Sequence, residues 1–207
     1  MTDDDIVLPE GTQPPPAVPA HIFAAAVDTF VAGRRLDMRS LARCIGVARA
    51  TLYRRVGNRE QLLDQVLWWR ARRLLADQVR ASADLTGADR LTAVITGVLR
   101  AIGADRPVRM FLESDPETAL RLLTGRGSTV HRGMAEALEN LIDLERGRGA
   151  FEASLDTSTL AFAIVRVSEG FLYSDVIADR TPDIGRAVTV IEALLRGLDL
   201  VHREPVP

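Results

Sequence analysis

The sequence predicts an all-α fold in which short N-terminal helices lead through one long helix into a larger helical C-terminal part. Apolar residues recur three and four positions apart from residue 19 onward, which is the spacing of one face of an α-helix. No run of β-branched residues alternates with polar ones, and no Asn-Gly or Asp-Gly pair marks a hairpin. Because 47 % of its 207 residues are hydrophobic, the chain can bury a substantial core.

The chain is expected to begin with a disordered arm over residues 1–17, because "DDD", "PEG" and "PPP" offer no periodic apolar pattern. The first helix is predicted over 19–32, with Gly33 as its stop. Its expected apolar stripe consists of Ile22, Phe23, Ala26, Val27, Phe30 and Val31.

Two short helices are predicted next, at 38–45 and 49–56. Asp37 is a suitable N-cap for the first of them. Gly46 suits the turn between them, because glycine adopts a positive φ without steric cost. Two short helices joined by such a turn are typical of a helix-turn-helix.

A long helix is predicted at 59–81, with Asn58 as its N-cap. It carries apolar residues at helical spacing and connects the short helices to the rest of the chain. Further helices are predicted at 87–105, from Pro107 onward, at 116–124 behind the cap Asp115, and at 128–147.

The last two helices, at 156–178 and 183–201, are apolar around more of their circumference than one core face requires. A helix that is apolar on every side is buried on every side. One interpretation is a central helix of a monomeric bundle. The other is that each helix packs on its own domain and on an identical copy, which makes a four-helix interface about a two-fold axis.

Positive charge is concentrated in one segment. All 26 basic residues are arginines, and residues 34–59 contain eight of them with a single acid, Asp37. This segment therefore carries a net charge of +7, whereas the whole chain carries −2. A solvated helix face usually mixes positive and negative charges. A segment with almost only positive charge therefore favours a surface that binds a polyanion.

The second helix of a helix-turn-helix enters the major groove of DNA while the first crosses the backbone. The outward side chains of the helix at 49–56 are then expected to meet DNA. We expect phosphate contacts from Arg39, Tyr53 and Arg59. The expected readers of base edges are Arg49, Thr51 and Arg54, with Ala50 beside them on the same face.

Residues 38–63, "MRSLARCIGVARATLYRRVGNREQLL", resemble the DNA-binding module of TetR-family transcriptional regulators. Gly46-Val47, the later "LYRR" and the following "REQLL" carry the resemblance. Ala48 departs from it, because the family usually has a Ser or Thr cap there, and this costs the recognition helix about 1 kcal/mol. Val56 replaces an aromatic residue, and Arg59 stands where a phosphate-contacting Lys is usual.

The segments "RMFLESDPETALRLLTGRGSTVHRG" and "FAIVRVSEGFLYSDVIA" resemble a subgroup of these regulators named for QsdR. Two interpretations of their polar residues stay open. Pairs such as Arg109–Glu113 and Arg166–Glu169 can be structural ion pairs at helical spacing, or they can contact a ligand. The candidate ligand-binding residues are Trp68, Trp69, Arg109, Glu113, Arg166, Glu169 and Tyr173, with Pro116 and Arg121 also carried over.

Other classes of chemistry find little support. No apolar run is long enough to span a membrane, the N-terminus lacks the features of a secretory signal, and one cysteine, Cys44, fits a reducing cytoplasm. The histidines His21, His131 and His202 lack zinc-ligand spacing and are expected at the surface or at helix ends. No metal and no cofactor is expected, and no catalytic residue is assigned.

The resemblance implies a ligand-responsive transcriptional regulator with a helix-turn-helix domain at 18–63 and a ligand-binding and dimerisation domain at 64–207. We expect a cytoplasmic homodimer that binds a palindromic operator in double-stranded DNA. It is expected to be a repressor, released by a small apolar or amphipathic effector. Two alternatives remain, a small helical enzyme acting on an apolar substrate and a helical protein-interaction adaptor.

Overall fold

The computed structural model describes residues 18–125, 127–178, 180 and 182–199. The predicted arm at 1–17 and the end of the last predicted helix lie outside these residues. Within them the chain is all-α, as predicted: it forms helices and one isolated β-bridge between Ala153 and Asp199, with no strand. No helix in this part of the chain is long and apolar enough to cross a membrane.

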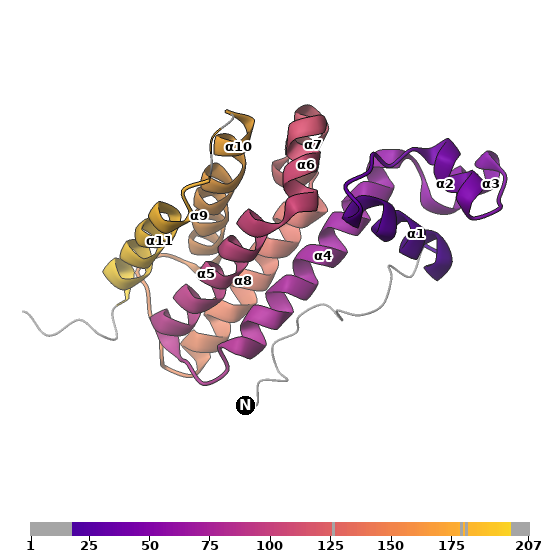
Figure 1. Ribbon diagram of the computed structural model, residues 1–207. Coiled ribbons are helices and arrows are strands. Elements are labelled where there is room, and N and C mark those ends of the chain that lie inside the picture. Colours follow the sequence, from indigo (N-terminus) through magenta and orange to yellow (C-terminus); the bar gives the residue numbers. More distant parts are fainter. Residues whose placement is uncertain (1–17, 126, 179, 181, 200–207) are drawn as a thin grey trace, which may run out of the picture.

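Three helices form a lobe at one end of the molecule: α1 (Ala20–Val31), α2 (Met38–Cys44) and α3 (Arg49–Val56) (Figure 1). The Asp37 side chain accepts a hydrogen bond from the Ser40 backbone N–H, which caps α2 and lowers the pKa of Asp37. Ala48 precedes α3 without a side-chain cap, as expected. The turn between α2 and α3 places Gly46 at a φ of 69°.

One prediction for this lobe is wrong. The apolar periodicity of the first helix placed Val31 on its buried stripe, but the side chain is 47 % exposed. Ile22, Phe23 and Phe30 are buried as expected, whereas Val27 is half-buried. Val31 is the last residue of α1 and lies beyond the core that buries the earlier apolar residues of this helix.

The long helix α4 (Arg59–Ala81) connects this lobe to the rest of the molecule (Figure 1). Its start is fixed by a capping box, in which the Asn58 side chain accepts from the Gln61 N–H and the Gln61 side chain accepts from the Asn58 N–H. Two of its core residues, Leu62 and Val66, are fully buried. This single helix therefore links the lobe directly to the C-terminal bundle.

The bundle begins with α5 (Gly87–Ala104), α6 (Arg106–Ser114), α7 (Pro116–Thr124) and α8 (Thr129–Gly147). Helices α5 and α8 pack against α4. Asp115 precedes α7 as predicted, and its carboxylate pairs with Arg59 of α4.

The helix predicted at 156–178 is not regular throughout. It consists of α9 (Thr157–Glu169), a π-helical turn η2 (Gly170–Ser174) and α10 (Asp175–Ile177). The final helix α11 (Ile184–Leu198) packs against α5. In Figure 1, α9 to α11 lie on the side of the bundle opposite the lobe.

Candidate DNA-binding surface and effector cavity

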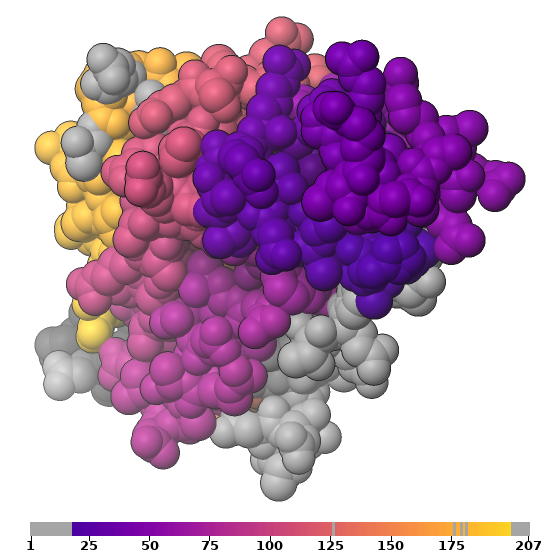
Figure 2. All heavy atoms as spheres, turned by 45° about the vertical axis from the view of Figure 1, so that its right-hand side comes forward, coloured from indigo at the N-terminus to yellow at the C-terminus, as the bar shows by residue number. Residues whose placement is uncertain are grey.

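Helix α3 is anchored by two side chains and leaves the others to solvent. Leu52 and Val56 are buried in the core of the lobe. The residues between them, Tyr53, Arg54 and Arg55, are exposed, and in Figure 2 the indigo and purple lobe lies at the front of the molecule. A short, two-sided helix at a convex end of the molecule has the shape that a groove of DNA can accept.

Most arginines of this lobe are exposed and form no ion pair within the part of the chain that the structure describes. Seven of the eight counted above have exposed side chains, and none of the seven is in an ion pair with a described carboxylate. Unneutralised charge on a convex surface is available to an external polyanion. These seven residues are Arg34, Arg35, Arg39, Arg43, Arg49, Arg54 and Arg55.

The remaining predicted DNA contacts on α3 lie on the same side. Ala50 and Tyr53 are exposed, and the Arg49 guanidinium lies 5.9 Å from the centroid of the Tyr53 ring. Thr51 is half-buried. The structure thus brings together the residues predicted to contact DNA from α3, with Arg39 on the neighbouring helix.

Arg59 has a different environment. Its Nε donates to the Leu36 carbonyl at 2.9 Å, and its Nη1 donates to Asp115 Oδ2 at 3.0 Å. The side chains of Arg59 and Asp115 are only 22 % and 25 % exposed. Burial would raise the pKa of Asp115, but hydrogen bonding to Thr118 and the charge of Arg59 lower it. Arg59 therefore ties the lobe to the start of α7.

A second cluster reinforces this junction. Arg121 on α7 pairs with Glu60 at 2.7 Å, one residue beyond Arg59 on α4. One turn further along α4, the Asp64 carboxylate accepts from the backbone N–H and the hydroxyl of Thr129, at the start of α8. The first turns of α4 are thus attached to both α7 and α8.

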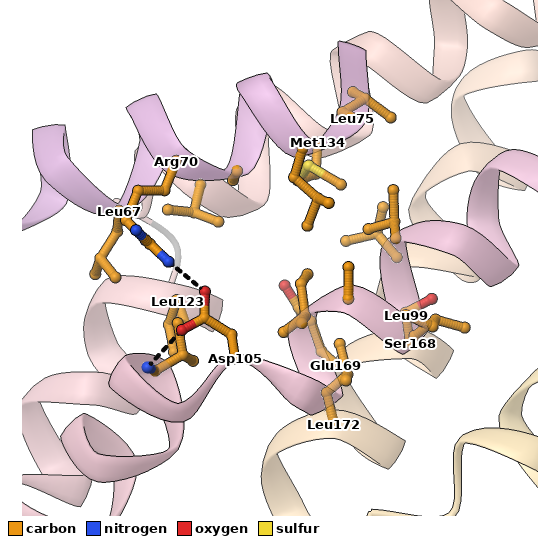
Figure 3. A pocket seen from close by; sticks show the side chains of 18 of the residues that line it. Leu67, Arg70, Leu75, Leu99, Asp105, Leu123, Met134, Ser168, Glu169 and Leu172 are labelled. Carbon is orange, nitrogen blue, oxygen red and sulfur yellow. Dashed lines mark hydrogen bonds and ion pairs between the residues drawn. The ribbon is translucent and has the colours of Figure 1, made fainter. Parts of the chain in front are cut away.

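The bundle encloses a cavity of about 570 Å³, within the range of sites for drug-sized ligands. Its walls come from α4, α5, α8, α9 and η2, with further residues from α1, α6 and α7. Most of the lining is aliphatic, and Figure 3 shows Leu67, Leu75, Leu99, Leu123 and Leu172 around it. The cavity is suited to an apolar molecule.

Polar side chains reach this cavity as matched groups. Arg70 pairs with Asp105 at 2.5 Å (Figure 3). His131 Nδ1 lies 2.7 Å from Glu169 Oε1, and both side chains are largely buried. Burial, reinforced by the negative charge of Glu169, raises the pKa of the Tyr173 hydroxyl, so this group is neutral at pH 7.

The predicted ligand-binding residues separate into two groups. Trp69, Glu169 and Tyr173 line the cavity. Trp68 instead faces α8, where a Cβ added at Gly133 would lie 2.3 Å from its ring. The other three, Arg109, Glu113 and Arg166, also lie outside the cavity lining.

The two predicted ion pairs had different outcomes. Arg166 pairs with Glu169 at 3.0 Å and also donates to the Thr124 carbonyl, as the structural interpretation requires. Arg109 and Glu113 are both exposed, and no ion pair joins them. The prediction of an Arg109–Glu113 pair is therefore wrong, because two long side chains in solvent gain little from holding one geometry.

Six polar lining residues were not predicted as ligand contacts: Arg70, Arg73, Asp77, Asp105, His131 and Ser168. His131 lies near the start of α8, as expected of a helix-end residue, yet it faces the cavity beside Glu169. Arg73 packs its guanidinium 4.8 Å from the centroid of the Trp69 ring. Its spacing of four residues from Trp69 is a helical-neighbour signal that could have drawn attention to it.

The fold and the exposed basic helix are those of a helix-turn-helix transcriptional regulator. Residues 86–196 match the model for the tetracyclin repressor-like C-terminal domain. The chain belongs to the TetR family, which confirms the resemblance found in the sequence. No curated protein matches it significantly.

Solved structures agree with this assignment. The transcriptional repressor QsdR of R. erythropolis, of the TetR family, is 27 % identical, with a TM-score of 0.77 over 89 % of this chain and 96 % of that one. The fatty acid degradation regulator FadR of Bacillus halodurans is 21 % identical, with a TM-score of 0.57 over 85 % and 96 %. The first similarity supports the predicted subgroup, and the second supports the fold.

Proposed function

We propose that this regulator is a homodimeric repressor whose α3 helices bind a palindromic operator and whose cavity binds an apolar or amphipathic effector that releases the DNA. The observation that carries the proposal is the cluster of exposed, unpaired arginines at one end of α4, with the cavity along the same helix. Within each protomer we assign base-edge contacts to Arg49, Thr51 and Arg54, and phosphate contacts to Arg39 and Tyr53.

The dimer is proposed to form through α9 and α11. Large apolar side chains are exposed on this side of the bundle, including Phe162 on α9 and Val190 on α11. The exposed face of α11 also carries the small residues Thr189, Ala193 and Gly197, which permit close approach of a second helix. Two copies of this pair of helices would form a four-helix interface.

Coupling between effector and operator has two physical routes in this chain. The first is α4, whose first turn carries the attachments of Arg59 and Glu60 and whose middle lines the cavity. The second is α1, since Val27 and Val31 belong to the lobe and also line the cavity. An effector that prefers a different separation of α1 and α4 would shift the lobe, and effector and operator then weaken each other by the same factor.

The regulator is proposed to act in the cytoplasm and to have no catalytic activity of its own. The polar cavity residues that could take part in chemistry are already engaged with one another, as in the His131–Glu169 and Arg70–Asp105 pairs. We assign no cofactor, and the proposed partners are duplex DNA, a second copy and the effector.

Selection of bound sequences from a random duplex pool tests the DNA-binding part directly. We expect a palindrome whose half-sites lie about one helical turn, roughly 34–36 Å, or a near multiple apart. Affinity for it should fall steeply with salt, because each neutralised phosphate releases counterions. Recovery of no enriched sequence, together with no duplex binding at low ionic strength, would overturn the proposal and favour the adaptor.

A further inference from the structure

The rim of the cavity carries one positive charge without a matching negative one. Arg73 on α4 lines the cavity and is also exposed, so it lies where the cavity meets solvent. Val31 of α1 and Asp77 of α4 are the other exposed residues of the lining. In the part of the chain that the structure describes, Arg73 has no ion pair and no hydrogen bond from its side chain to a protein group.

The acidic groups of the lining are already neutralised. Asp105 pairs with Arg70. Glu169 is held by His131 and Arg166. The third acid, Asp77, is four residues from Arg73, but its carboxylate pairs with Arg80. Among the described lining residues, the unmatched charge is therefore the guanidinium at the rim.

The Arg73 guanidinium is also held in place. It lies over the Trp69 ring at 4.8 Å from the centroid, and Trp69 packs edge-to-face on Phe23 of α1 at 5.6 Å. A planar guanidinium stacked on an aromatic ring keeps its N–H edge free to bind a carboxylate. A preorganised cation loses less conformational entropy on binding than a freely rotating one.

Behind this rim the cavity is apolar. Its deeper lining includes Val94, Leu99 and Ile164, all almost fully buried. From the rim cation and this apolar interior we infer that the effector is an anionic amphiphile, whose carboxylate binds Arg73 and whose aliphatic tail fills the cavity. This inference rests on the effector-binding role proposed above and adds the chemical class of the ligand.

The position of the head group also suggests how binding reaches the DNA-binding lobe. A carboxylate at Arg73 lies beside Trp69, whose ring packs on α1, and the first carbons of the tail pass Val31. The ligand would thus contact both α4 and α1 at the point where they diverge. Tail burial supplies affinity, and the head group fixes the ligand at the junction of the two domains.

The test compares acids with neutral molecules of the same length in the full chain. Decanoate, dodecanoate and tetradecanoate, below their micellar concentrations, are titrated beside the corresponding alcohols, with tryptophan fluorescence as the readout because Trp69 lines the cavity. We expect the acids to bind at least about tenfold more tightly than the alcohols, the range for a charge-assisted contact. This preference should decrease as salt is added.

Arg73→Gln tests the residue and Arg100→Gln is its matched control. Arg100 is exposed on α5, outside the cavity lining, and the same charge is removed there. We expect R73Q to abolish the preference for the acid while the affinity for the alcohol stays unchanged, and R100Q to keep the preference. Equal binding of acid and alcohol by the unmodified chain, or an unchanged preference in R73Q, would overturn the inference.

Release of the selected operator, measured in parallel, distinguishes failure of this inference from failure of the proposed function. If alcohols and acids bind equally and both release the DNA, the effector role stands and the anionic head group is wrong. If no amphiphile of either kind binds or affects the operator complex, the inference and the effector role both fail.

Discussion

The arginines at the two ends of the molecule are used in opposite ways. Those of the lobe between residues 34 and 55 are exposed, and none is in an ion pair with a carboxylate that the structure describes. Those of the bundle are mostly paired, from the fully buried Arg90–Glu145 pair to exposed pairs such as Arg196–Glu192. Arginine thus mostly stabilises the structure in the bundle, whereas in the lobe it is available to bind an external anion.

This difference shows that partners, more than residue identity, indicate function in a chain whose basic residues are all arginine. A guanidinium beside a carboxylate is largely neutralised and contributes to folding or to local packing. A guanidinium without a neighbouring carboxylate keeps its positive charge unneutralised and can attract an external anion. Within the described residues Arg73 lacks a carboxylate partner like the lobe arginines, and unlike the exposed, unpaired Arg100 and Arg109 it also lines the cavity.

The largest expected effect comes from breaking the most buried pair. Glu145 accepts from Arg90 at 3.0 Å, from the Gly87 N–H at 2.7 Å and from Arg148 at 3.2 Å. Arg90→Met should lower the free energy of unfolding by about 3–5 kcal/mol, because it leaves a buried carboxylate without its main counterion. Urea denaturation measures this, with Arg100→Met as the exposed control. A loss equal to that of the control would contradict a structural role.

Charge reversal in the lobe should affect DNA binding and leave the fold intact. Arg49→Glu with Arg54→Glu is expected to reduce operator affinity at least about 100-fold, because two groove contacts of about 1–3 kcal/mol each are lost. The thermal midpoint should stay close to that of the unmodified chain, since neither side chain is in an ion pair. Fluorescence anisotropy with labelled operator is the measurement, and Arg100→Glu is the control. Unchanged affinity would support the adaptor alternative.

The exposed side of α9 and α11 carries large apolar side chains, including Phe162 and Val190, which predicts a protein partner for that face. Val190→Glu should weaken dimerisation by about 1–3 kcal/mol, because it brings two carboxylates into an apolar interface. Leu85→Glu, at 40 % exposure against 42 % for Val190, is the matched control in the turn before α5. Analytical ultracentrifugation over a range of protein concentrations measures the dimer dissociation constant of each variant. Identical dimer constants would exclude α11 from the interface.

The local parts of this comparison could be predicted from the sequence. Helix bounds, the caps Asp37 and Asn58, and the exposed arginines of α3 depend on residues within a few positions of one another. Helical periodicity reports such local relations well. For the same reason it located the recognition helix to the residue.

The long-range parts could not be predicted in this way. The cavity is assembled from seven α-helices and the η2 turn, and no local pattern reports which of their faces meet. The Arg59–Asp115 pair joins residues far apart in the chain, so the sequence offered Arg59 to phosphate without indicating its partner. The η2 turn also escaped prediction, because a single turn of π-helix is too short to give a periodic signal of its own.

The smallest expected effect concerns Arg59, which combines features of both classes. Its pair with Asp115 is partly exposed, so Asp115→Asn should destabilise the fold by about 1 kcal/mol or less. Because hydrogen bonding to Thr118 and the pair with Arg59 lower the pKa of Asp115 in the folded state, these contacts stabilise the protein above the ordinary carboxyl pKa of about 3.9. That contribution is lost as the pH falls through the folded-state pKa. The unfolding free energy of D115N should therefore decline less between neutral pH and pH 3.

The same variant decides whether Arg59 acts on DNA. If Arg59 contacts phosphate, as its place in the sequence predicts, D115N frees the guanidinium and operator affinity should rise or stay equal, while Arg59→Gln lowers it. If Arg59 acts through the link between Leu36 and Asp115, both variants should lower operator affinity together, because both remove that link. Anisotropy titrations measure the change in operator affinity for each variant. If only R59Q lowers the affinity, Arg59 acts on DNA like the lobe arginines. If R59Q and D115N both lower it, Arg59 acts like the paired arginines of the bundle.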